Sequence, residues 1–372
     1  MGNRISEGHE TARDFGKTTY APFDSGTSRR RFLKALAVAG ASAVLPASGL
    51  LAQATSGGRR VVPGRIDVHH HMIPPFYVKA ISEATGTPAI PNVAPWTPEI
   101  SIDSMDKAGV ATALLSVLEG LVVDSLSAKN ETSRKLARQS NEYGAKLVRD
   151  YPGRFGLLAT LPLPDTDGSL EEIAYSLDTL KADGIHLFTS FRDKFVGDPA
   201  FFPTYEELNR RNAVVFYHPS KNTCCRHLPG QSGIIDYNID TARAIDSMLF
   251  SGNLSKFPNV RHIFTHAGGA FSVLAAREAD DLPRAHADKV PKGVNYEVAK
   301  LYFDVAHASK AADLDALQDI APVSHIVYGS DSPVRAYPLT DVGLDQYPRF
   351  SENDWKAINR GNAEQLFPRL KA

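Results

Sequence analysis

From residue 65 onward, short runs rich in β-branched and other apolar residues alternate with longer stretches whose apolar residues recur at helical spacing. The short runs predict eight strands, at residues 66–71, 112–117, 155–161, 185–189, 214–218, 261–266, 301–305 and 325–329. Helices are predicted in most of the gaps, most clearly at 131–150 and 169–182, and a closing helix is predicted at about 353–366. Strands that alternate with helices predict a parallel sheet with crossover helices, and eight is the strand number of the closed barrel.

We therefore predict an α/β fold, a single (β/α)8 TIM barrel, with a long loop excursion at 72–111 that lies over the C-terminal mouth. No linker rich in proline, glycine or serine divides residues 60–372, so residues 55–372 are expected to form one domain. A doubly wound open sheet is the structural alternative. It is disfavoured because no strand is followed by a G-x-G-x-x-G loop or a Walker P-loop.

The first 54 residues carry the three parts of a signal peptide. The basic region reads Ser-Arg-Arg-Arg-Phe-Leu-Lys at 28–34, an uncharged stretch follows at 35–51, and the cleavage site has the small residues Ala-Gln-Ala at 52–54. The paired Arg29 and Arg30 resemble a bacterial twin-arginine signal. Because the uncharged stretch is shorter than the ~20 apolar residues that span a bilayer, no stable membrane anchor is expected after processing. The sequence predicts a periplasmic or otherwise exported protein.

Composition changes this picture mainly by exclusion. Lys plus Arg number 41 against 42 Asp plus Glu among 372 residues, so the near-zero charge gives no indication of a nucleic-acid partner. With 43% hydrophobic residues, the chain can bury a large core. The only two cysteines, Cys224 and Cys225, are adjacent, and Cα atoms about 3.8 Å apart are too close for an ordinary disulfide.

The first predicted strand carries polar residues in a regular pattern. Side chains alternate along a strand, so Asp67, His69 and His71 are predicted on one face, and Val68 and His70 on the other. Two imidazoles that leave one face two residues apart can chelate a metal ion. The pattern therefore makes His69 and His71 candidate ligands.

Further residues of ligand type end other predicted strands: His218, His266 and Asp331. TIM-barrel enzymes keep their active site at the C-terminal ends of the strands, so these side chains are expected to meet the two histidines of the first strand. Unrelated hydrogen-bonded residues at strand ends are the alternative. Imidazoles with one carboxylate suit a divalent metal ion, Zn²⁺ by default and Mn²⁺ as a substitute. Strand 185–189 offers no Lys, Asp or Glu to bridge a second ion, which favours a single metal.

These motifs together resemble a known family. They read Ile66-Asp67-Val68-His69-His70-His71, Tyr217-His218-Pro219, Thr265-His266-Ala267-Gly268-Gly269, Tyr328-Gly329-Ser330-Asp331 and Gly361-Asn362-Ala363-Glu364-Gln365-Leu366-Phe367. Over residues 65–370 the chain resembles the amidohydrolase-related group, and within it the metal-dependent decarboxylases that act on aminocarboxymuconate semialdehyde, γ-resorcylate and 6-methylsalicylate. The same metal ligands also occur in hydrolases of that group.

The resemblance implies a set of roles for particular residues. His69, His71, His218 and Asp331 would hold the metal, and His266 would be the acid or base beside it. Arg277 would contact the substrate carboxylate, and in some relatives that residue comes from a neighbouring subunit, which implies a homodimer. Residues 66–133 contain no arginine and residue 334 is valine, two departures that fit a smaller substrate with one carboxylate.

Three functional classes remain open from the sequence. The first is a decarboxylase of a small aromatic or enol-like acid, in which His266 or Asp331 delivers the proton. The second is a hydrolase of a lactone, ester or amide that uses metal-bound hydroxide. The third is a non-catalytic metal-binding protein, which an open barrel mouth disfavours. Trp96 is a candidate for stacking on an aromatic substrate, and Cys224 and Cys225 are expected not to be ligands.

Overall fold

The computed structural model describes residues 64–86, 95–118, 130–220 and 232–371. All of them belong to one compact unit, Arg59–Ala372. The predicted signal peptide at residues 1–54 lies outside the described residues, and so do Cys224 and Cys225. Among the described helices, none has the length and apolar character needed to cross a membrane.

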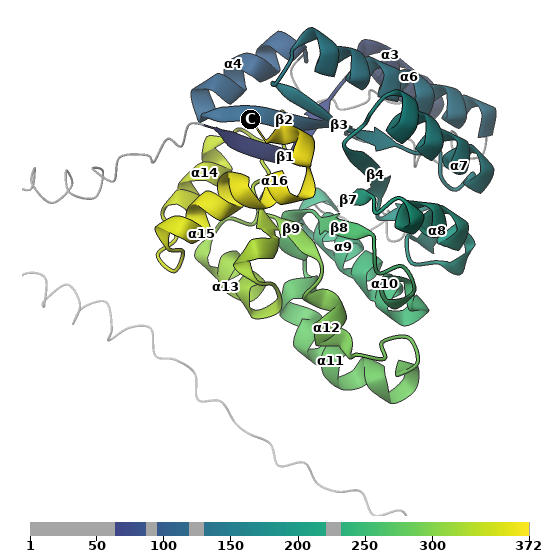
Figure 1. Cartoon of the computed structure of the whole chain (residues 1–372), viewed down its shortest axis with the longest axis vertical. Coiled ribbons are helices and arrows are strands. Elements are labelled where there is room, and N and C mark those ends of the chain that lie inside the picture. The colour runs from purple at the N-terminus through teal and green to yellow at the C-terminus, as the bar shows by residue number, and fades with distance from the viewer. Residues whose placement is uncertain (1–63, 87–94, 119–129, 221–231, 372) are drawn as a thin grey trace, which may run out of the picture. The chain divides into compact units, whose positions relative to one another are not determined.

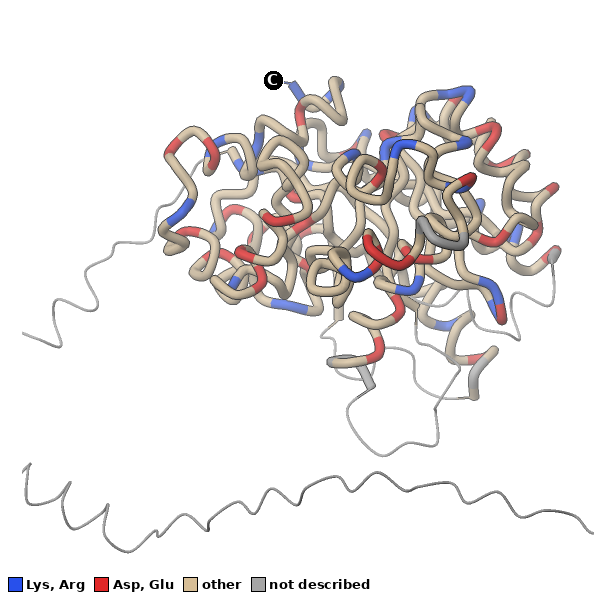
Figure 2. The backbone as a smooth tube through the Cα atoms, turned by 90° about the horizontal axis from the view of Figure 1, so that it is seen from below, with Lys and Arg blue, Asp and Glu red and all other residues tan. Residues whose placement is uncertain are grey.

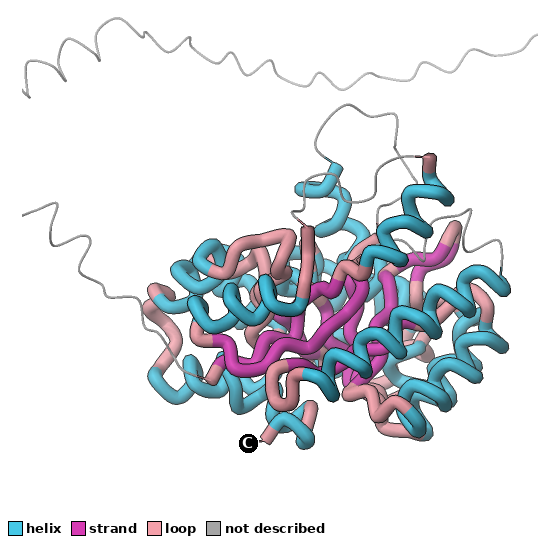
Figure 3. The backbone as a smooth tube through the Cα atoms, turned by 90° about the horizontal axis from the view of Figure 1, so that it is seen from above, coloured by secondary structure: helices cyan, strands magenta, loops and turns pink. Residues whose placement is uncertain are grey.

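Eight parallel strands form one sheet at the centre of this unit, as Figure 3 shows. In sheet order they are β1 (Arg65–Met72), β2 (Val110–Val117), β3 (Phe155–Thr160), β4 (Gly184–Phe188), β7 (Val214–His218), β8 (Arg261–Phe264), β9 (Tyr302–Asp304) and β10 (Ile326–Val327). A separate antiparallel pair joins β5 (Ser190–Phe191) to β6 (Lys194–Phe195). All eight predicted strands are present, although the last three are each two or three residues shorter than expected.

Hydrogen bonds between β1 and the chain around and after β10 close the sheet into a barrel. Val68 N–H donates to the carbonyl of Tyr328 (3.0 Å), and His71 N–H donates to the carbonyl of Ser332 (2.8 Å). The first and last strands are therefore neighbours, as a TIM barrel requires. The predicted (β/α)8 barrel is confirmed.

Helices surround the strands (Figure 1). They are α3 (Pro75–Thr85), α4 (Pro98–Ala108), α6 (Asn130–Asp150), α7 (Thr166–Ala174), α8 (Phe202–Arg210), α9 (Ser232–Ser251), α10 (Asn253–Lys256), α11 (Phe271–His286), α12 (Val294–Val298), α13 (Ala311–Ile320), α14 (Pro338–Asp345), α15 (Glu352–Lys356) and α16 (Asn362–Leu366). Basic and acidic residues are interspersed along the described chain (Figure 2). No face of one sign dominates this view, in keeping with the balanced composition.

The excursion after β1 is more regular than a loop. Its described parts contain α3 and α4, and α4 packs beside β2 as a crossover helix does. Pro98 occupies the first turn of α4, and the Thr97 side chain caps the helix by accepting from Ile100 N–H (3.3 Å). The proline-rich sequence that predicted a loop thus includes a helix start.

The core has two layers because the strands alternate their side chains. Inside the barrel, apolar residues from the early part of several strands pack together, among them Val68, Leu158, Phe216 and Ile263. Leu366 and other residues of the C-terminal segment pack against this inner cluster and close the barrel at the N-terminal ends of the strands. A second, larger cluster fills the space between the strands and the helices. Inside the barrel, the polar residues His69, His71 and His218 therefore lie toward the opposite end.

A bulge in β1 changes the predicted faces of two residues, Asp67 and Val68. The register of β1 against β2 shifts between Asp67 and His70, so an extra residue enters the strand. Asp67 and His70 lie on the same side, with Oδ2 and Nδ1 3.4 Å apart, and both contact Tyr337. The predictions that Asp67 shares a face with His69 and His71, and Val68 with His70, are both wrong, because simple alternation fails at the bulge. His69 and His71 still share one face of β1.

Candidate active site

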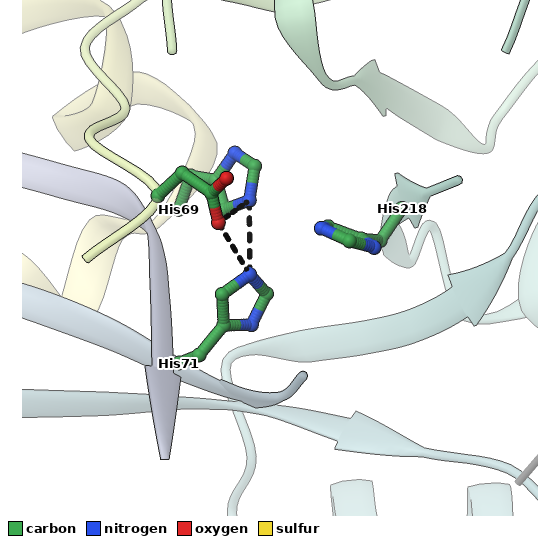
Figure 4. A group of neighbouring side chains, drawn as sticks. His69, His71 and His218 are labelled. Carbon is green, nitrogen blue, oxygen red and sulfur yellow. Dashed lines mark hydrogen bonds and ion pairs between the residues drawn. The ribbon is translucent and has the colours of Figure 1, made fainter. Parts of the chain in front are cut away.

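Four of the predicted site residues meet at the C-terminal end of the barrel. Each of His69, His71, His218 and Asp331 offers one ligand atom, and these atoms lie within 4.8 Å of one another. Oδ1 of Asp331 lies 2.9 Å from Nε2 of His71 and 3.2 Å from Nε2 of His69, and the two Nε2 atoms are 3.1 Å apart. Figure 4 shows the imidazoles of His69, His71 and His218 converging on one point. All four side chains are buried.

Hydrogen bonds on the far side of each ring aim the histidines inward. His69 Nδ1 donates to Oδ2 of Asp304 (2.8 Å), and His218 Nδ1 donates to the carbonyl of Pro219 (2.9 Å). Nδ1 of His71 bonds to the hydroxyl of Ser116 (3.1 Å). Outer contacts of this kind orient metal-binding histidines in known sites, and here they leave each Nε2 facing the centre.

The charges around this cluster favour a positively charged group at its centre. Burial lowers the pKa of His69, but the carboxylates of Asp304 and Asp331 outweigh it and raise that pKa to about 10. Burial holds the pKa of His218 well below its usual range, and its buried Nε2 has no hydrogen-bond partner among the described residues. An inward-facing lone pair beside a carboxylate fits a divalent cation, which would take the place of the proton on His69. The residues present therefore fit a metal ion.

The candidate acid or base stands next to this cluster. The ring of His266 has its centroid 5.3 Å from that of His69 and 5.9 Å from that of His218. Its buried Nε2 has no hydrogen-bond partner among the described residues and lies 3.8 Å from Oδ2 of Asp331. Burial lowers the pKa of His266, so the ring is neutral near pH 7. A neutral imidazole with a free nitrogen can take up a proton and return it.

The backbone at the site is held in an unusual conformation. His266, Ala267, His307 and Asp331 have positive φ values of 55° to 64°. Non-glycine residues seldom adopt this left-handed region, and such residues concentrate at functional sites. The turn after each strand therefore directs the side chain back over the barrel mouth.

Sequence reasoning missed two residues of the site. Oδ1 of Asp304 accepts from the backbone N–H groups of His266 (2.9 Å) and Ala306 (3.0 Å), while its Oδ2 holds His69. His307 contacts Oδ2 of Asp331 through Nε2 at 2.8 Å. The sequence did carry a signal for Asp304, which is an acidic residue near the end of the predicted strand 301–305.

Two other predicted residues lie away from the cluster in this chain. Arg277 is on α11, with 83% of its side chain exposed, and pairs with Asp281 at 3.6 Å. Trp96 is only 7% exposed, and its indole N–H donates to Ser101 (2.8 Å), whose hydroxyl also contacts His70 on the outer side of β1. These contacts place Trp96 in the packed outer layer. They give no support to stacking on a substrate.

Comparison with known proteins agrees with this geometry. A family model described as Amidohydrolase matches residues 66–369. The chain belongs to the amidohydrolase family. The resemblance recognised in the sequence motifs is thereby confirmed over almost the whole barrel.

Several known proteins resemble the chain over nearly their full length. Decarboxylase macB of Penicillium terrestre is 38% identical over 324 residues, which cover 82% of this chain and 96% of that protein. The 6-methylsalicylic acid decarboxylase of Penicillium expansum is 34% identical, with coverage of 82% and 97%. A dihydroxybenzoic acid decarboxylase from Polaromonas sp. JS666, solved with manganese and 2-nitroresorcinol, has a TM-score of 0.69 at 19% identity, covering 84% of this chain and 98% of its own. At that identity it supports the barrel fold alone.

Proposed function

We propose that this protein is a metal-dependent, non-oxidative decarboxylase of a small aromatic or enol-like carboxylic acid of the salicylate type. The observation that carries this proposal is the likeness, above 30% identity and over nearly the full length, to proteins named as decarboxylases. The site agrees with it, because a metal-binding cluster and a free histidine nitrogen lie side by side at the barrel mouth.

His69, His71, His218 and Asp331 are the residues that would hold the metal ion, a single Zn²⁺ by default or Mn²⁺. A divalent ion there would supply the positive charge that fixes a carboxylate and a neighbouring oxygen of the substrate. Strand β4 carries His186 and no acidic residue or lysine, which favours one ion over two.

We assign proton transfer to His266, which lies beside the metal ligands. The ligand Asp331 is the other candidate. The carbon–carbon bond breaks, carbon dioxide leaves, and the electron pair stays on the ring carbon, which then needs one proton. A neutral His266 can take a proton from a substrate hydroxyl and return it to that carbon. Its unpartnered Nε2 leaves it free to do so.

We further propose that the protein acts as a homodimer in which Arg277 binds the substrate carboxylate of the neighbouring subunit. The exposed position of Arg277 on α11 supports a contact outside its own barrel. Mixing Arg277→Ala subunits with Asp331→Ala subunits should restore part of the activity, because one site of the mixed dimer is then complete. Verified mixed dimers without any activity would show that Arg277 does not act across subunits.

Export is part of the proposal as well. The pattern at residues 28–54 supports passage through the twin-arginine pathway, which would place the enzyme in the periplasm or otherwise outside the cytoplasm.

An isotope experiment distinguishes decarboxylation from hydrolysis. In heavy water, the enzyme with a hydroxybenzoic acid should release carbon dioxide and place deuterium on the carbon that carried the carboxylate. His266→Asn should retain the metal and slow this reaction by about 10²- to 10⁴-fold, the range for loss of a general acid or base. If such acids are inert while lactones or esters are cleaved with solvent oxygen in the product, the protein is a hydrolase.

A further inference from the structure

His307 stands at the open side of the site, outside the predicted set of ligands. Its side chain is 39% exposed, whereas the four ligand candidates are buried. Nε2 of His307 lies 2.8 Å from Oδ2 of Asp331. Its ring is edge-on to that of His266, with centroids 5.2 Å apart. His307 therefore contacts the carboxylate ligand and the proposed acid–base residue together.

Asp331 and Arg335 together fix which nitrogen of His307 carries the ring proton. The backbone N–H of Arg335 donates to the carbonyl of Asp331 (2.9 Å), so one turn of chain brings Arg335 back beside the site. Its Nη1 lies 3.2 Å from Nδ1 of His307. A guanidinium can only donate, so Nδ1 accepts and the ring proton sits on Nε2. That N–H donates to Oδ2 of Asp331.

This bond divides the two carboxylate oxygens of Asp331 between different tasks. Oδ1 faces His69 and His71 at the predicted metal position, while Oδ2 is taken by His307. The other group near Oδ2 is Nε2 of His266, at 3.8 Å. Without His307, a small rotation of the His266 ring would let a protonated Nε2 donate to Oδ2, which would hold that proton away from the substrate.

We propose that His307 is a positioning residue which, held by Arg335 with its proton on Nε2, occupies Oδ2 of Asp331, commits Oδ1 to the metal, and keeps His266 available to the substrate. This inference deepens the proposed function and rests on it for its catalytic consequence. Its structural part concerns the tautomer of His307 and the affinity for metal, which can both be measured without a substrate.

The tautomer is tested by long-range ¹H–¹⁵N NMR of the Zn²⁺-loaded protein with ¹⁵N-labelled histidine. The His307 signal is assigned by its disappearance in His307→Gln. It should show the ring proton on Nε2 in the wild type, because the carboxylate of Asp331 only accepts and the guanidinium of Arg335 only donates. A wild-type proton on Nδ1 would overturn the assignment.

Metal affinity provides the second test, by competition of Zn²⁺ between the protein and a chelator. His307→Phe removes the donor and should weaken binding by about 10- to 100-fold, the range for lost outer contacts of metal ligands. His307→Gln retains an N–H donor and should recover most of that loss. His325→Phe is the matched control, because His325 precedes β10 at the opposite end of the barrel, where it packs on Tyr302.

The effect on catalysis separates positioning from substrate binding. At saturating Zn²⁺, with any acid that the wild type decarboxylates, His307→Phe should lower kcat at least 10-fold and change KM by less than 3-fold. Equal metal affinity and equal kcat in His307→Phe and wild type would overturn the inference. If no acid is decarboxylated at all, the proposed function fails, whereas the tautomer and the metal affinity still decide the role of His307.

Discussion

His218 and His70 should respond to substitution in opposite ways. His218 points its Nε2 at the predicted metal position, whereas His70, between two ligand candidates in sequence, points to the outer side of β1. We expect His218→Ala to lose metal and to have about the stability of the metal-free wild-type protein. We expect His70→Ala to keep the metal and to lose stability.

The magnitude for His70→Ala follows from its contacts. Its ring is fully buried, with Nδ1 3.0 Å from the hydroxyl of Tyr337 and Nε2 2.9 Å from that of Ser101. Two hydrogen bonds at about 1 kcal/mol each, together with the cavity left by the ring, give a loss of about 2–5 kcal/mol. For a barrel of ~300 residues, that corresponds to a fall in Tm of roughly 3–8 °C.

For His218→Ala, the expected change is in the affinity for the metal ion. Losing one of four ligands should weaken binding by roughly 10²- to 10³-fold, if the ~10–16 kcal/mol of a four-ligand zinc site is shared among its ligands. Elemental analysis after dialysis should then give about one equivalent for wild type and His70→Ala, and far less for His218→Ala. Calorimetry of the same samples gives the stability. Equal metal loss from both variants would refute the outward direction of His70.

Three further expectations can be checked directly. Chelation should lower Tm, and added Zn²⁺ or Mn²⁺ should restore it, since a ligand at 100 times its Kd stabilises by about 2.7 kcal/mol; a Tm indifferent to chelator would exclude a bound metal. Burial, and to a smaller extent the nearby Glu278, raise the pKa of Asp246 to about 7, above its value in the unfolded chain. Ionisation of Asp246 therefore lowers the stability of the folded protein as the pH rises from about 4 to 7. The Tm of Asp246→Asn should therefore rise relative to that of the wild type over this pH range. Equal changes of Tm with pH in the two proteins would contradict the raised pKa. Changing Arg29 and Arg30 together to Lys should trap the precursor in the cytoplasm, and unchanged processing in cell fractions would count against the twin-arginine route.

The barrel and the centre of its site could be predicted because both depend on simple periodicity. Buried parallel strands read as apolar runs, and their C-terminal ends meet at one end of a barrel. Residues that stand at those ends, such as His218 and Asp331, could therefore be grouped before their distances were known. The pairing of His69 with His71 needed only the two-residue repeat of a strand.

The remaining features depend on contacts that no periodicity records. Asp67 was assigned to the wrong face because a bulge adds one residue without altering the apolar pattern. His307 follows its strand by three residues, and its role depends on Arg335, which is close only because the chain turns back after Asp331. The helix α4 was overlooked because Pro98, which begins it, also suits a loop.

The packing of the C-terminal segment against the inner cluster also bears on the order of events in turnover. Leu366 and Phe367 pack below the apolar residues in the early part of several strands, so the described chain leaves no passage through the lumen. Substrate and products therefore exchange at the C-terminal mouth of the barrel, where the side chain of His307 is 39% exposed. The aromatic product then occupies the place of the next acid until it departs, and it should act as a competitive inhibitor of the enzyme.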